Sequence, residues 1–134
     1  MSRILIIDDD ASLRSILRSV LEKSGHTVFE ASGGREGLVL WRRQQTDVVI
    51  TDLYMPETDG IEVIHELRKC CSPPKIICMS GGGKSEVFGW GKVALSLGAN
   101  SVLHKPFDRP SFLAAIAAAL ANMHYVAHVS PSAS

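Results

Sequence analysis

The sequence lacks an excess of charge of either sign. Its 134 residues carry 14 lysines and arginines against 14 aspartates and glutamates, which gives a formal net charge of zero at pH 7. Without a global basic field, the chain has no long-range attraction for nucleic acid or for an anionic membrane surface. We therefore expect neither nucleic acid nor a membrane among its partners.

Cysteine and long hydrophobic runs are also scarce. The three cysteines, Cys70, Cys71 and Cys78, form no CxxC pair and leave one odd. No apolar run approaches the length that spans a membrane, and the first residues lack the layout of a signal peptide. We therefore expect reduced thiols and a cytoplasmic location. The adjacent Cys70 and Cys71 are interpreted as ordinary residues at a helix end rather than as a redox or metal device.

The chain does contain enough apolar material for one folded domain. Hydrophobic residues make up 46% of it and charged residues 21%, which is the balance of a globular protein with a real core. The length suits one domain and leaves no room for a second of ordinary size. We expect this domain to cover residues 1–124. The remaining stretch, 125–134, is terminal and ends in small polar residues, so we expect it to be disordered.

Short apolar runs alternate five times with longer amphipathic segments. The apolar runs predict strands over residues 4–7, 27–31, 48–51, 75–79 and 101–104. The amphipathic segments predict helices over residues 12–21, 34–44, 57–69, a stretch ending near 97, and 109–121. Strands that are apolar throughout, rather than alternating, indicate a parallel sheet covered by helices on both faces. The predicted class is therefore a doubly wound α/β domain.

Polar side chains follow these strands, at the edge of the sheet where α/β proteins bind ligands. Three of these side chains are the carboxylates of Asp8, Asp9 and Asp52. Carboxylates brought together at one edge would raise one another's pKa unless a cation lay among them. A hard cation that prefers oxygen ligands and keeps some waters is Mg²⁺. An amine and a hydroxyl nearby suit an anion such as phosphate. The set is what phosphoryl transfer to a carboxylate requires; its members are Asp8, Asp9, Asp52, Ser80 and Lys105.

In order and spacing, these motifs resemble those of response-regulator receiver domains from two-component signalling. The resemblance covers roughly residues 3–121 and is carried by Asp8-Asp9, Asp52, Met55-Pro56, Asp59-Gly60, Ser80-Gly81 and Lys105-Pro106-Phe107. It implies a flavodoxin-like (βα)5 fold, with a five-stranded parallel sheet in the order 2-1-3-4-5.

The resemblance also implies a role for each acid. Asp52 would accept the phosphoryl group. Asp8, Asp9 and Asp52 would hold Mg²⁺ together with the backbone carbonyl of Tyr54. Asp10, one residue past the acidic pair, is interpreted as a helix N-cap or a solvent-facing charge.

The remaining motif residues receive roles in the same way. Ser80 and Lys105 would bind phosphoryl oxygens, and the peptide bond between Lys105 and Pro106 would be cis. Gly60 is expected to give backbone freedom at the start of the following helix.

The implied function is that of a single-domain response regulator without an output domain. It would take phosphate from a histidine kinase or a histidine phosphotransfer protein and then switch a partner-binding surface. It would not be an enzyme beyond its own phosphorylation and slow dephosphorylation, and we expect a monomer or weak dimer. Three alternatives stay open: a phosphorelay shuttle that passes phosphate to a second histidine protein, a small Mg²⁺-dependent phosphatase, and a docking module that is never phosphorylated.

The chain departs from the family pattern in two places. The segment between Ser80 and Lys105 is longer than in typical receivers and rich in glycine, so its helix is expected to start late, near residue 87 or 92. Valine also stands at position 102, where many receivers carry a tyrosine or phenylalanine that moves on phosphorylation. We therefore expect output to pass through the glycine-rich loop, with a switch or partner surface at Gly81, Phe88, Trp90 and Val102.

Overall fold

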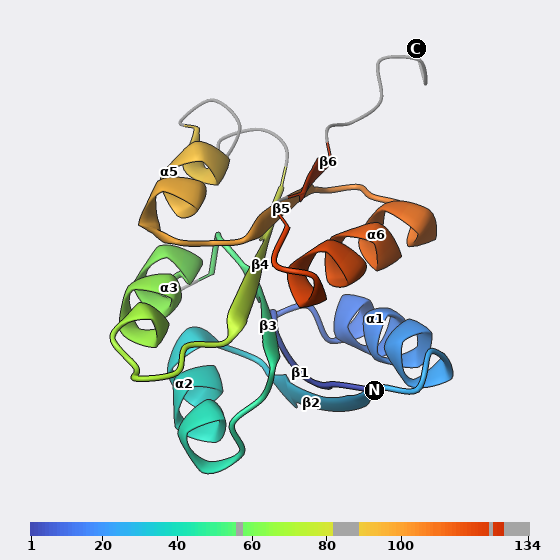
Figure 1. The fold of residues 1–134 in the computed structure, drawn as a ribbon, viewed down its shortest axis with the longest axis horizontal. Coiled ribbons are helices and arrows are strands. Elements are labelled where there is room, and N and C mark those ends of the chain that lie inside the picture. The colour runs from blue at the N-terminus through green and yellow to red at the C-terminus, as the bar shows by residue number, and fades with distance from the viewer. Residues whose placement is uncertain (56–57, 82–88, 124, 128–134) are drawn as a thin grey trace.

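A parallel β-sheet forms the centre of the structure, and helices cover both of its faces (Figure 1). The structure is a computed structural model that describes residues 1–55, 58–81, 89–123 and 125–127. The strands are β1 (Arg3–Ile7), β2 (Thr27–Ala31), β3 (Val48–Asp52), β4 (Lys75–Ser80), β5 (Ser101–His104) and β6 (Tyr125–Ala127). The helices are α1 (Ala11–Lys23), α2 (Gly34–Arg43), α3 (Gly60–Arg68), α5 (Trp90–Leu97) and α6 (Arg109–Leu120).

The strands lie in the order β2-β1-β3-β4-β5-β6, and every neighbouring pair is parallel. The first five positions confirm the predicted order 2-1-3-4-5. The sixth strand differs from the prediction of five strands followed by a disordered tail. Because α6 returns the chain to the edge of β5, residues 125–127 reach backbone groups there, with Val126 opposite Val102. The rest of the predicted tail, 128–134, lies outside the described residues.

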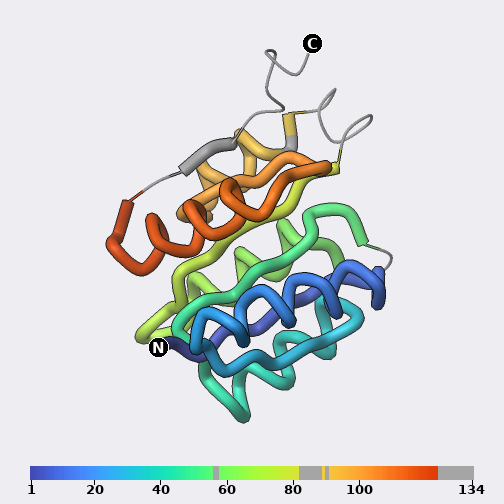
Figure 2. Tube along the Cα trace, turned by 90° about the vertical axis from the view of Figure 1, so that its right-hand side faces the viewer, coloured from blue at the N-terminus to red at the C-terminus, as the bar shows by residue number. Residues whose placement is uncertain are grey.

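Helices α1 and α6 cover one face of the sheet, while α2, α3 and α5 cover the other (Figures 1 and 2). Alternate residues of β1 therefore enter different cores. Leu5 and Ile7 pack on the side of α2 and α3, and Ile4 and Ile6 pack on the side of α1 and α6. Each such side chain, removed fully from water, stabilises the fold by about 1.5–3 kcal/mol. Burial on both faces is the reason that β1 is apolar from Ile4 to Ile7.

Aspartates set the start of three helices. Their carboxylates accept hydrogen bonds from backbone N–H groups of the first turn, which have no partner inside the helix. Asp10 caps α1, Asp59 caps α3 and Asp108 caps α6. The interpretation of Asp10 as an N-cap is confirmed. The prediction that α3 begins at residue 57 is wrong, because the cap at Asp59 places the first helical residue at Gly60.

Helix α5 begins at Trp90, so the prediction of a late start in this part of the chain is confirmed. It ends at Gly98, whose φ of 117° is a left-handed conformation that glycine adopts without strain. Residues 82–88, which include Val87 and Phe88, lie outside the described residues.

Candidate functional site

The polar residues singled out in the sequence meet at the carboxyl ends of the central strands. Asp8 directly follows β1, Asp52 is the last residue of β3, Ser80 is the last of β4, and Lys105 directly follows β5. These four strands are consecutive neighbours in the sheet and point in the same direction. Parallel pairing therefore gathers residues up to 97 positions apart at one edge.

Three carboxylates form a cluster at this edge. Oxygen atoms of Asp8, Asp9 and Asp52 all lie within 4.8 Å of one another. The side chains of Asp8 and Asp52 are buried, whereas Asp9 is exposed. The cluster is therefore exposed to solvent at Asp9, while Asp8 and Asp52 lie within the protein.

Lys105 joins two of these carboxylates. Its Nζ lies 3.1 Å from Oδ2 of Asp8 and 3.0 Å from Oδ2 of Asp52. Burial alone would lower the pKa of Lys105, but Asp52 and Asp8 outweigh it and raise that pKa above the usual lysine range. The lysine is therefore a fixed positive charge between the two buried acids. The predicted cis peptide bond between Lys105 and Pro106 is confirmed.

The donor set fits a small hard cation. Burial raises the pKa of Asp8, and the nearby charge of Asp52 adds to this effect, although hydrogen bonds from the backbone of Asp10 and from Lys105 oppose it. Removing two acids from water at this spacing is unfavourable unless positive charge compensates them. Carboxylate oxygens with an opening to solvent are the ligands that Mg²⁺ prefers. Asp8, Asp9 and Asp52 are thus the residues here that are suited to hold it.

Backbone hydrogen bonds fix the two buried carboxylates. The N–H of Asp10 donates to Oδ1 of Asp8 over 2.8 Å, and the N–H of Tyr54 donates to Oδ1 of Asp52 over 3.1 Å. In each case the second oxygen accepts from Lys105. Both acids therefore present a fixed orientation at the edge.

Gly60 has a different role from the predicted one. It has no positive φ, so conformational freedom is not what its position requires. A Cβ at this position would instead collide with the carbonyl oxygen of Asp52 and would lie 2.7 Å from Cα of Leu53. The N–H of Gly60 also donates to the carbonyl of Leu53 over 3.1 Å. The absent side chain lets the start of α3 rest directly on the backbone that carries Asp52.

The residues predicted to form a switch or partner surface lie in different environments, and they do not form one surface. Gly81 follows β4 and is half-buried, and Trp90 opens α5. Val102 is only 1% exposed and lies beneath α5, where a Cβ on Gly91 would come within 3.2 Å of its Cγ1. Val102 is therefore part of the core and not of a surface. Phe88 lies outside the described residues.

Two further residues complete the description of the site. Tyr54 is 64% exposed, and its backbone N–H contacts the carboxylate of Asp52, two residues before it. Arg14 was not identified from the sequence. Its Nη1 donates to the backbone carbonyl of Asp8 over 2.6 Å, and its Nε donates to Glu30 over 3.0 Å. The sequence feature that could have identified Arg14 is its position in the first turn of a predicted helix, where the helix dipole disfavours positive charge.

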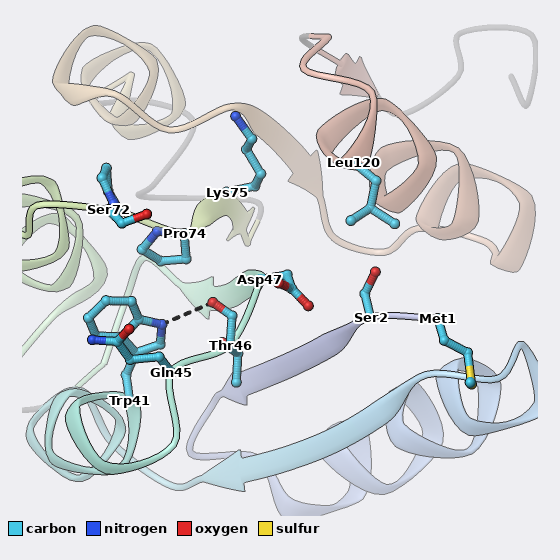
Figure 3. A pocket seen from close by; sticks show the side chains of 11 residues that line it. Met1, Ser2, Trp41, Gln45, Thr46, Asp47, Ser72, Pro74, Lys75 and Leu120 are labelled. Atoms are coloured by element: carbon cyan, nitrogen blue, oxygen red, sulfur yellow. Dashed lines mark hydrogen bonds between the residues drawn. The ribbon is translucent and has the colours of Figure 1, made fainter.

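A separate pocket of about 530 Å³ lies at the opposite end of the sheet (Figure 3). Trp41, Thr46, Asp47 and Lys75 line it, and the indole N–H of Trp41 donates to the carbonyl of Thr46. None of the predicted site residues that the structure describes lines this pocket.

The fold and the edge residues together define a flavodoxin-like α/β domain with a carboxylate cluster and a lysine at the carboxyl ends of its strands. The chain belongs to the response regulator receiver domain family, whose model matches residues 4–117. Receiver domains are signalling modules of two-component systems rather than enzymes in the usual sense, and they bind Mg²⁺ at an acidic pocket. Among the described residues, no helix is long and apolar enough to cross a membrane.

Similar proteins include receivers of about this length. Protein PilH of Pseudomonas aeruginosa is 36% identical over 124 residues, with 90% of this chain and 99% of PilH covered. Chemotaxis protein CheY of Halobacterium salinarum is 32% identical over 114 residues, covering 85% and 92%. The crystal structure of a receiver domain protein from Clostridium thermocellum has a TM-score of 0.82 at 30% identity, covering 90% of this chain and 95% of that one.

Other relatives are longer proteins. The probable transcriptional regulator ycf27 of Guillardia theta is 38% identical over 118 residues, and the match covers 88% of this chain but 45% of that protein. KdpE of Escherichia coli, a transcriptional regulatory protein of the KDP operon, is covered over 46% of its length. The chain thus spans about half the length of these relatives.

Proposed function

We propose that this protein is a phosphate-accepting receiver in a two-component or phosphorelay system, with Asp52 as the acceptor. The observation that carries the proposal is the placement of Asp52. Its carboxylate is buried, lies within 4.8 Å of two further carboxylates and is bound by Lys105 over 3.0 Å. A structural acid needs neither the two like charges nor the lysine, whereas a phosphoryl acceptor needs a cation site and a fixed positive charge beside it.

The proposed donor is a phosphohistidine of a histidine kinase or of a histidine phosphotransfer protein. An oxygen of Asp52 attacks the phosphorus in line, forming the O–P bond of an aspartyl phosphate. The N–P bond of the donor breaks, and its electron pair returns to the imidazole nitrogen, which takes a proton from solvent.

The other residues of the site orient and neutralise the phosphoryl group. Asp8, Asp9 and Asp52 would hold Mg²⁺, with the carbonyl of Tyr54 as a further ligand. The ion, when bound, supplies positive charge to the phosphoryl oxygens. Lys105 pairs with another of these oxygens, and the hydroxyl of Ser80 donates a hydrogen bond to one. A change at Ser80 and Gly81 would then be transmitted towards α5, where a partner binds.

The proposal predicts that Asp52→Asn abolishes phosphorylation. Wild-type protein incubated with Mg²⁺ and acetyl phosphate should gain the mass of one phosphoryl group in intact mass spectrometry, and the variant should gain none. Asparagine keeps the size of the side chain but is a far weaker nucleophile than a carboxylate. A control variant, Asp47→Asn, removes an exposed acid at the opposite end of the sheet and should be phosphorylated like the wild type. An equal mass gain in Asp52→Asn would place the acceptor elsewhere.

Tyr54 is predicted to prolong the life of the aspartyl phosphate. Tyr54 lies two residues after the acceptor and its bulky side chain is exposed, so the ring would restrict the approach of water to the aspartyl phosphate. In Tyr54→Ala the phosphorylated form should hydrolyse up to about tenfold faster, which corresponds to about 1.4 kcal/mol of barrier. Tyr54→Phe keeps the ring and should retain the wild-type lifetime. The decay of the phosphorylated mass after removal of acetyl phosphate measures both, and an unchanged lifetime in Tyr54→Ala would reject this role.

A further inference from the structure

We propose that Arg14 is a positioning residue for the Mg²⁺ site, and that Glu30 holds it in place. This inference rests on the proposed function. Arg14 lies in the first turn of α1, yet its guanidinium reaches the end of β1. There Nη1 donates to the backbone carbonyl of Asp8 over 2.6 Å. Nε donates at the same time to Oε1 of Glu30, on the neighbouring strand β2, over 3.0 Å.

The contact completes the immobilisation of Asp8. The N–H of this residue donates to the carbonyl of Ala31 over 3.1 Å, and its two carboxylate oxygens accept from Asp10 and Lys105. Its carbonyl is the one remaining polar group, and Arg14 binds it. Every hydrogen-bonding group of Asp8 is thus engaged, so the direction of its carboxylate is fixed before any cation arrives. Partners of this kind, one step behind a metal ligand, orient that ligand.

Helix stability does not explain the position of Arg14. A cation in the first turn of a helix opposes the helix dipole, and α1 has no acidic residue in that turn. The compensating charge comes instead from Glu30 on β2. The pKa of Glu30 is lowered, chiefly by its hydrogen bond with Arg18 and further by that with Arg14, while burial opposes the shift. Glu30 is thus an ionised anchor that Arg14 shares with Arg18.

Arg18 provides a matched control within the same network. Its Nη1 lies 2.8 Å from Oε2 of Glu30, and its Nε lies 3.1 Å from Glu22. Arg18 therefore carries the same charge and shares the same anchor, but no contact with Asp8 is described for it. A loss of Mg²⁺ affinity that arises from the charge network alone would appear equally in Arg14→Met and Arg18→Met.

The test compares Mg²⁺ binding by calorimetry in wild type, Arg14→Met and Arg18→Met. Loss of a positive charge near three carboxylates would by itself tighten binding of a cation. Loss of a positioning contact should weaken it, by about tenfold or more. We expect Arg14→Met to bind Mg²⁺ at least about tenfold more weakly, and Arg18→Met to bind it as tightly as the wild type or more tightly. The two explanations therefore predict changes of opposite sign.

Further readouts separate positioning from loss of folding. Amide NMR shifts of residues 8–10 should change in Arg14→Met and stay constant in Arg18→Met, with thermal unfolding recorded for both. Arg14→Lys keeps the charge and one donor and should recover part of the affinity. If Arg14→Met does not fold, Glu30→Gln loosens the anchor of Arg14, and the amide NMR shifts of residues 8–10 should still change in this variant. Its Mg²⁺ affinity is not the readout, because losing an acid weakens cation binding by charge alone.

The possible failures are distinguishable. A wild-type protein that binds no Mg²⁺ would overturn the proposed function together with this inference. A wild type that binds Mg²⁺, with Arg14→Met binding it equally well or better, would overturn the positioning role alone. Equal weakening in Arg14→Met and Arg18→Met would also overturn it, because only the first of these arginines reaches Asp8.

Discussion

Lys105→Met is expected to slow phosphorylation of Asp52 by acetyl phosphate by about 100-fold or more and, in the same protein, to tighten the binding of Mg²⁺. The two effects have one origin. The ammonium group of Lys105 binds Oδ2 of Asp8 and Oδ2 of Asp52. Without the lysine, these oxygens lose a competing cation, so Mg²⁺ meets more negative charge. The transferring phosphoryl group, however, loses a fixed positive charge, and removal of one such group commonly costs 100- to 1000-fold in rate.

The measurement is the rate of mass gain at saturating Mg²⁺, alongside a calorimetric titration with Mg²⁺. Lys75→Met is the control. Lys75 begins β4 at the opposite end of the sheet, so its loss changes the net charge equally without touching the acidic cluster. The control should match the wild type in both measurements. Normal phosphorylation in Lys105→Met would show that the lysine serves only to hold the two buried acids in the unphosphorylated protein.

Gly60→Ala is expected to lower the free energy of unfolding by about 3 kcal/mol, at the upper end of the range for overpacking. The added methyl group would collide with the carbonyl oxygen of Asp52 and approach Cα of Leu53 to 2.7 Å. Both are backbone atoms, so neither can rotate away as a side chain would. Relief requires α3 to move off the end of β3, which would also displace the phosphoryl acceptor.

Urea unfolding measures the loss, and Gly81→Ala is the matched control. Among the described residues, no heavy atom lies within 4 Å of a Cβ on Gly81, and Gly81 has no positive φ. Its replacement should leave stability unchanged or raise it by a few tenths of a kcal/mol through the unfolded chain. If Gly60→Ala were as stable as Gly81→Ala, the close approach between α3 and β3 would not be required by the fold.

The sequence by itself determined the class of fold and the identity of most site residues. Runs such as Ile4–Ile7 are apolar on every residue, which is typical of a strand buried on both faces. Parallel strands share one carboxyl edge, so Asp8, Asp52 and Lys105 had to meet there once each was placed after its strand. Local patterns sufficed because the apolar character of each strand, and its alternation with amphipathic helices, can be seen in short stretches of chain.

Only the tertiary structure decided the remaining features, since each depends on residues that are distant in sequence. The role of Gly60 follows from the approach of α3 to the carbonyl of Asp52. The strand at 125–127 depends on α6 returning the chain to the edge of β5. The contact of Arg14 with Asp8 requires the anchor Glu30 on a separate strand. A sequence pattern records the periodicity of each element, but the distances between side chains of different elements arise only when those elements pack.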